Sequence, residues 1–161
     1  MGDPLSVAAS IAGLISLAGQ LYTTLDNMIF NVRDAPSLAR TVRAEIKGFR
    51  DSLSSFHTIL VNSNYRQGRG VLIPAENIVV TIMDAIFLFS ELESILRPLT
   101  STTEFTVLQR SQWARKKSKL VELVDRLQWH KGTLSLQLQI LQWSEILSER
   151  LPGRLCANFW S

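Results

Sequence analysis

Hydrophobic residues recur at intervals of three and four along four long stretches of this chain, and polar residues, glycine or proline fill the breaks between them. This interval matches the 3.6-residue turn of an α-helix. The sequence therefore predicts four helices. Their approximate bounds are residues 4–30, 37–61, 74–97 and 105–147.

The first stretch carries no charge over the twenty-two residues from Pro4 to Leu25. The pair Asp3–Pro4 suits a helix start, with the aspartate as the cap and the proline in the first turn. One side of this helix is an apolar stripe, and the opposite side is weakly polar and uncharged. The stripe consists of Val7, Ile11, Leu14, Ala18, Leu21, Leu25 and Met28.

Three interpretations of this first helix stay open. It can be a bundle helix that its neighbours cover, since small apolar helices are ordinary core material. It can be buried at rest and enter a membrane on activation. It can also span a membrane permanently, because its length is sufficient. Secretion is not predicted, because no basic residues precede the apolar run.

The second and third stretches differ in polarity. The second is amphipathic, and Gly48 within it indicates either a close helix crossing or a locally weak helix. The third has Asp84 as its single charge between residues 78 and 89. This pattern predicts a central, buried helix in which Asp84 pairs with a base on a neighbouring helix. We expect Pro98 to stop this third helix.

The last stretch is the longest. At 1.5 Å per residue its forty or so residues would reach roughly 60 Å, so we expect this helix to bend, with Gly132 as the candidate point, or to overhang. Short connections between the helices predict an all-α fold, an antiparallel four-helix bundle over residues 1–148. Residues 149–161 show no pattern and are predicted to form an unstructured tail.

Composition indicates a folded chain with little solvating surface. Hydrophobic residues make up 46% and charged residues 19% of the 161 residues, which is typical of a chain that works in an assembly or near a membrane. His57 and His130 are expected at a helix flank and at the surface, without a metal-ligand neighbour at helical spacing. With one cysteine, Cys156, and no nucleotide-binding or nucleophile motif, the sequence predicts no enzyme, cofactor or metal site.

Four basic residues stand within five positions near the start of the last helix, and a tryptophan precedes them. They are Arg115, Lys116, Lys117 and Lys119, after Trp113. One interpretation is a solvated helix face. The other is contact with anionic lipid head groups, since each base near such a surface contributes about 1 kcal/mol and tryptophan suits the interface. Nucleic acid is not predicted, because no stacking platform accompanies the cluster.

Three segments of the chain read DPLSVAASIAGLISLAGQLY, VVTIMDAIFLFSELESIL and WARKKSKLVELVDRLQWHKGTLSLQLQILQ. In this order they resemble the fungal HeLo-like domains, the N-terminal modules of STAND, or NOD-like, receptors. The resemblance covers most of residues 3–143. It implies an all-α bundle that acts in programmed cell death by exposing its N-terminal helix to a membrane. Carried over to this chain, the membrane-insertion candidates are Leu5, Val7, Ile11, Leu14, Ile15, Leu17 and Leu21.

Two functions follow as expectations. The first is a non-enzymatic signalling or interaction module that acts at membranes through its N-terminal helix, with anionic lipids, a protein partner or a second copy of the chain as partners. The alternative is an accessory protein of a fungal secondary-metabolite gene cluster that acts by protein–protein contact. The same family contains a short stand-alone protein encoded among azaphilone pigment genes, and this chain resembles it in being a bare domain. We expect a cytoplasmic protein that can associate with membranes and has no small-molecule substrate; an enzyme of the same pathway is a minor third hypothesis.

Overall fold

All four predicted helices are present in a computed structural model of the chain, which describes residues 4–31, 36–62, 75–100 and 107–150. Side chains are described for residues 8–30, 36–59, 61, 77–100 and 110–143. The helices are α1 (Pro4–Asn31), α2 (Ser37–Asn62), α3 (Ala75–Thr100) and α4 (Val107–Arg150). The all-α prediction is confirmed. Of the predicted tail, residues 151–161 lie outside the described part of the chain.

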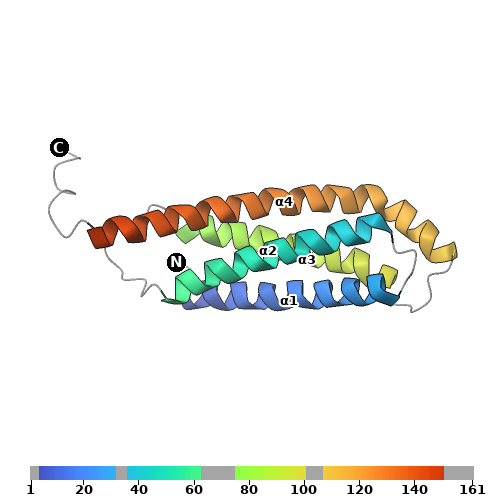
Figure 1. Cartoon of the computed structure of the whole chain (residues 1–161), viewed down its shortest axis with the longest axis horizontal. Helices are drawn as coiled ribbons and strands as arrows, with labels where there is room; N and C mark the ends of the chain where they lie inside the picture. The colour runs from blue at the N-terminus through green and yellow to red at the C-terminus, as the bar shows by residue number, and fades with distance from the viewer. Residues whose placement is uncertain (1–3, 32–35, 63–74, 101–106, 151–161) are drawn as a thin grey trace.

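Successive helices run in opposite directions and form a four-helix bundle in which α4 is the longest member (Figure 1). Between the described residues, α1 packs against α2 and α3, and α4 packs against the same two helices. α1 and α4 therefore occupy opposite corners of the bundle, as do α2 and α3.

Apolar stripes from the four helices fill the centre of the bundle. Phe49 of α2 and Phe89 of α3 meet across the diagonal with their ring centroids 5.2 Å apart, and both are fully buried. The predicted stripe of α1 faces this core, which confirms its helical spacing. Its buried members are Ile11, Leu14, Ala18, Leu21, Leu25 and Met28.

α3 is not the fully surrounded helix that its composition predicts. Val80 is 59% and Phe87 67% exposed, and Asp84 is exposed as well. A helix in a square bundle has two neighbours and one core-facing side, so its fourth side faces solvent whatever its composition. The predicted buried ion pair of Asp84 is therefore wrong, because its carboxylate is solvated and pairs with no described base.

The prediction that Pro98 stops α3 is also wrong. The helix runs through Pro98 to Thr100. A proline this close to the end interrupts only the last turn of backbone hydrogen bonds. The buried side chain of Leu99 holds that turn to the core, and the Thr100 hydroxyl donates a 2.9 Å hydrogen bond to the carbonyl of Leu96.

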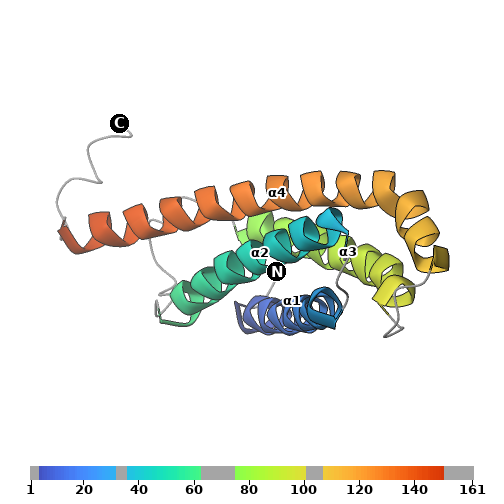
Figure 2. The same ribbon diagram turned by 45° about the vertical axis from the view of Figure 1, so that its right-hand side comes forward.

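α4 both overhangs the bundle and bends (Figures 1 and 2). It has 44 residues, against 26 in each of α2 and α3. The bend lies near the start of α4 and not at Gly132, where the sequence predicts it. Gly48 does not mark a close helix crossing, because a Cβ at this position would lie at ordinary contact distance, 3.6 Å, from the flexible Lys131 side chain of α4.

Candidate functional site

α1 carries all seven membrane-insertion candidates, and the structure places those whose side chains it describes toward the core. The buried or partly buried ones are Ile11, Leu14, Ile15, Leu17 and Leu21. Leu5 and Val7 belong to α1, but their side chains lie outside the described residues. The apolar stripe of α1 thus contacts α2 and α3. α1 would have to leave the bundle before this stripe could meet a membrane.

The solvent-facing side of α1 is small and uncharged. Ala12, Gly13, Ser16 and Gln20 are exposed along it. Among the described helices, α1 is the one that is long and apolar enough to cross a membrane, over the 23 residues Ala8–Phe30. A buried core helix or a signal sequence has the same length and composition, so this property alone does not decide between them.

Two contacts near the C-terminal end of α1 connect it to α2. The Arg43 guanidinium donates a hydrogen bond to the Asp26 carboxylate in an ion pair, and the Arg50 guanidinium lies 5.4 Å from the centroid of the Tyr22 ring. Partly exposed pairs of these kinds contribute about 1 kcal/mol or less each. The attachment of α1 therefore depends mainly on its buried stripe.

The basic cluster at the start of α4 falls into two parts. Three of its members are exposed and form no ion pair with any acid in the described part of the chain: Arg115, Lys116 and Lys117. Lys119 turns toward α3, where its Nζ lies 3.0 Å from the Glu91 carboxylate, and it also lies 3.1 Å from the carboxylate of Glu122 on its own helix. Lys119 is therefore engaged within the bundle, and the other three bases are free to meet an anionic surface.

Glu91 receives two bases from α4. Lys119 hydrogen-bonds to it, and the Arg126 guanidinium lies 3.2 Å from its other oxygen. The hydrogen bond from Lys119 holds the pKa of the Glu91 carboxyl below its ordinary value, and Arg126 acts in the same direction. These contacts join the middle of α3 to α4.

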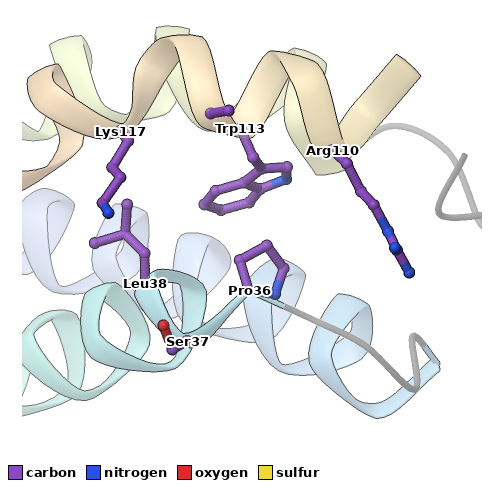
Figure 3. Close-up of a pocket in the computed structure, with 7 residues that line it drawn as sticks. Pro36, Ser37, Leu38, Arg110, Trp113 and Lys117 are labelled. Atoms are coloured by element: carbon purple, nitrogen blue, oxygen red, sulfur yellow. The ribbon is translucent and has the colours of Figure 1, made fainter. Parts of the chain in front are cut away.

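Trp113 is not exposed beside the basic cluster. Its side chain is 3% exposed and packs over the start of α2, where it lines a shallow pocket of about 450 Å³ (Figure 3). Pro36 and Leu38 of the α2 side and Lys117 of α4 line the same pocket. In this position Trp113 anchors the bent start of α4 to α2, and its indole N–H has no hydrogen-bond partner among the described residues.

Glu45 connects the other side of α4 to α2. Its carboxylate accepts hydrogen bonds from Lys131 Nζ at 2.6 Å and from Gln128 Nε2 at 3.0 Å. Burial alone would raise the pKa of Glu45, but the hydrogen bonds from Lys131 and Gln128 outweigh burial and lower it. Such mutual satisfaction of partly buried polar groups is typical of a structural contact.

The two histidines do not form a site. His130 is 5% exposed, so the prediction of a surface position is wrong, and His57 is partly buried. Burial lowers the pKa of His130, while Asp84 acts to raise it and Arg126 to lower it. Within the described ranges, no three side chains of His, Cys, Asp or Glu are grouped so that they could hold a metal ion.

Several large apolar side chains on α3 and α4 are exposed, and the sequence did not predict their exposure. We call this group the α3/α4 apolar face. It consists of Val80, Met83, Phe87, Trp129, Leu136, Ile140 and Trp143.

A signal for this face was present in the sequence. α4 contains two apolar series at seven-residue spacing, and the structure buries one of them and exposes the other. The buried series is Leu127, Leu134 and Leu141, and the exposed one is Trp129, Leu136 and Trp143. Two such series on one helix indicate two apolar sides, of which a bundle core can cover only one.

No family model, curated protein or solved structure matches this chain.

Proposed function

We propose that this chain is a non-enzymatic signalling module that attaches to anionic membranes through the exposed bases at the start of α4 and then acts on the bilayer through α1. The observation that carries the proposal is the lack of charge on both sides of α1 from Pro4 to Leu25. A surface helix of a soluble bundle ordinarily has charged residues on its outer side. The resemblance to HeLo-like domains implies the same kind of activity.

In this proposal the bundle binds the membrane surface while α1 is still packed in place. Arg115, Lys116 and Lys117 are exposed and without acid partners in the described part of the chain, so an anionic surface can approach them with no change of fold. At about 1 kcal/mol for each base, the three together contribute about 3 kcal/mol, which corresponds to a roughly 100-fold gain in binding.

In this proposal α1 then leaves the bundle and inserts into the bilayer. The 23 residues Ala8–Phe30 are about 35 Å long as a helix, which exceeds the roughly 30 Å of bilayer hydrocarbon. The single charge in this span, Asp26, lies near its C-terminal end. It would therefore remain at the membrane surface while the uncharged part crosses the interior.

The attachment step is tested by co-sedimentation with vesicles that contain phosphatidylserine. Replacing all three free bases with glutamine should weaken binding roughly 100-fold. The matched control exchanges the bases without loss of charge, as Arg115→Lys, Lys116→Arg and Lys117→Arg, and should bind like the wild type. Undiminished binding of the glutamine variant would contradict this assignment.

The insertion step is tested by dye leakage from the same vesicles. Ser16 is exposed in the middle of α1, so Ser16→Lys leaves the bundle core untouched but costs about 2.5–3.5 kcal/mol at the centre of a bilayer. We expect leakage to be lost while binding and thermal stability are kept. Ser54→Lys, at an exposed position of α2, is the control and should leak normally.

A substitution on the buried side of α1, such as Leu14→Glu, would not test membrane insertion cleanly. Leu14 is 2% exposed, so a carboxylate there would destabilise the bundle itself.

The insertion step would be contradicted if vesicles leaked as much dye with Ser16→Lys as with the wild type, because α1 would then not insert.

A second candidate is an accessory protein, for example of a secondary-metabolite gene cluster, that acts by protein–protein contact. The α3/α4 apolar face favours it, because a contiguous exposed apolar patch of this extent commonly marks an interaction site. A wild-type protein that neither sediments with anionic vesicles nor releases dye would favour this candidate over the first.

A further inference from the structure

We infer that the α3/α4 apolar face is the interface of a symmetric dimer of this chain. The inference goes beyond the proposed membrane function and does not depend on it. Seven of the exposed large apolar side chains belong to this face, and three of them are aromatic: Phe87, Trp129 and Trp143. Aromatic residues are enriched in protein interfaces.

The apolar residues of the two helices lie on one continuous surface. Two contacts mark the boundary between α3 and α4. They are the ion pair between Glu91 and Arg126 and the 3.2 Å hydrogen bond from the Gln137 amide to the Thr81 hydroxyl. Residues three or four apart are neighbours on a helix surface. Phe87 is one turn from Glu91, and Trp129 and Ile140 are one turn from Arg126 and Gln137. The exposed apolar side chains therefore flank the boundary from both sides.

The two helices also present these residues at the same height. α3 and α4 are antiparallel, and Thr81 lies opposite Gln137. Val80 and Met83 are therefore level with the part of α4 around Leu136, and Phe87 is level with Trp129. The face is about 21 Å long, from Trp129 to Trp143 at 1.5 Å per residue.

Three of the four α4 members of the face are spaced symmetrically about Leu136. Trp129 precedes Leu136 by seven residues and Trp143 follows it by seven. A two-fold axis through Leu136, perpendicular to α4, would bring a second α4 alongside in the opposite direction and place each Trp129 against Trp143 of the other copy. A two-fold interface requires this kind of self-complementary surface, whereas an unrelated partner would not.

The exposed area is sufficient for such a dimer. Phe87, Trp129 and Trp143 are 67%, 67% and 64% exposed, which corresponds to roughly 300–500 Å² for side chains of about 150–250 Å² each. The four aliphatic members of the face add a comparable area. Together they approach the roughly 800 Å² that each partner contributes to a stable complex.

Charge favours a second copy over an anionic membrane. Residues 132–143 contain no charged side chain, so a two-fold axis at Leu136 brings no like charges together there. The exposed charges nearest to the face are of both signs, namely the acids Asp84 and Asp125 and the base Arg126, which pairs with Glu91. The unpaired bases Arg115, Lys116 and Lys117 lie twelve or more residues away along α4, so a lipid surface would be attracted elsewhere.

The test is the mass of the full chain in solution, by light scattering coupled to size exclusion. We expect the wild type at twice 18.1 kDa. Leu136→Lys and Leu136→Glu each place two like charges at the axis and should halve the mass. Leu136 is 62% exposed, so circular dichroism should show an unchanged bundle. Val121→Lys, at a 41% exposed position of α4 away from the face, should remain dimeric.

The decisive sample is an equimolar mixture of the Leu136→Lys and Leu136→Glu proteins. Opposite charges then meet at the axis, and the dimer mass should return as a heterodimer. A wild type that is monomeric at its highest soluble concentration would overturn the inference. So would variants that stay dimeric, or a mixture that stays monomeric. Vesicle binding by a monomer that is lost in Leu136→Lys would assign the face to lipid and overturn it as well.

A cross-link provides a second readout. Residues on a two-fold axis lie close to their own copies, within the Cα separation of about 4.4–6.8 Å that a disulfide requires. Leu136→Cys combined with Cys156→Ser should therefore form a covalent dimer on mild oxidation. Val121→Cys combined with Cys156→Ser is the matched control and should remain a monomer on a denaturing gel.

Discussion

The imidazole of His130 is buried on α4, where Asp84 of α3 and Arg126 of its own helix are the charges that act on it. Its Nδ1 has no hydrogen-bond partner among the described residues, and its ring lies edge-on to Trp129 with centroids 5.0 Å apart. Burial disfavours the charged imidazolium, so the pKa of His130 is lower in the folded protein than in the unfolded chain.

This difference in pKa makes the stability of the protein depend on pH. As the pH falls below the ordinary histidine pKa of about 6.5, the unfolded chain takes up a proton before the folded protein does. The free energy of unfolding should therefore decrease between pH 7.5 and 5.5. Melting temperatures measured across this range should fall for the wild type and fall less for His130→Gln. Identical slopes for the two proteins would contradict the assignment to His130.

At the scale of the helix, α1 contains a glycine that its surroundings do not require. A Cβ at Gly13 would meet no atom within 4 Å, and Gly13 lies in the middle of α1. Gly13→Ala should stabilise the protein by about 0.5–1 kcal/mol, because alanine loses less backbone entropy in a helix. Urea unfolding measures this change. The reverse substitution at the adjacent exposed position, Ala12→Gly, should destabilise by a similar amount, and equal effects of the same sign would contradict the argument.

The helices and their order could be predicted from the sequence because each has a continuous apolar stripe, as Leu14, Leu21 and Leu25 show on α1. The exposure of α3 could not. Val80 and Phe87 are of the same apolar residue types that fill the core, and only the square packing of the four helices shows that they face solvent. A bend in α4 was expected from its length, but its position was predicted wrongly, since the buried position of Trp113 over α2 depends on a contact between segments far apart in the sequence.

The candidate site could also be predicted only in part, because contacts between helices are not visible in the sequence. The sequence groups Arg115 to Lys119, but it does not show that Lys119 pairs with Glu91 while its three neighbours remain free. It also does not show which of two seven-residue series on α4 is covered. Both outcomes depend on the angle at which α4 rests on α3, which no single helix encodes.

At the scale of the whole molecule, the core of the bundle contains a contact between its diagonal helices α2 and α3. Phe49 and Phe89 are both fully buried with their rings in contact. Phe49→Ala should lower the free energy of unfolding by about 3–5 kcal/mol, because it leaves a cavity at the centre. This loss is a large part of the roughly 5–15 kcal/mol that holds a domain together. Chemical denaturation measures it.

A milder change at the same position is the control. Phe49→Leu keeps most of the buried volume, so its effect on the free energy of unfolding should be clearly smaller than that of Phe49→Ala. Both variants should unfold in a single transition if the four helices form one cooperative unit. Separate transitions for different helices would show that the diagonal contact does not join them.

The six buried side chains of α1 also determine how rarely that helix can be found outside the bundle. Ala18 is too small to contribute much, but if each of the other five contributes about 1.5 kcal/mol, the lower end of the range for a large buried apolar side chain, exposing them costs about 7.5 kcal/mol. At tenfold for each 1.4 kcal/mol, fewer than roughly one molecule in a hundred thousand has α1 released at any moment. Thermal fluctuation alone therefore rarely releases α1, and a larger population with α1 free would require a ligand that binds the open form preferentially.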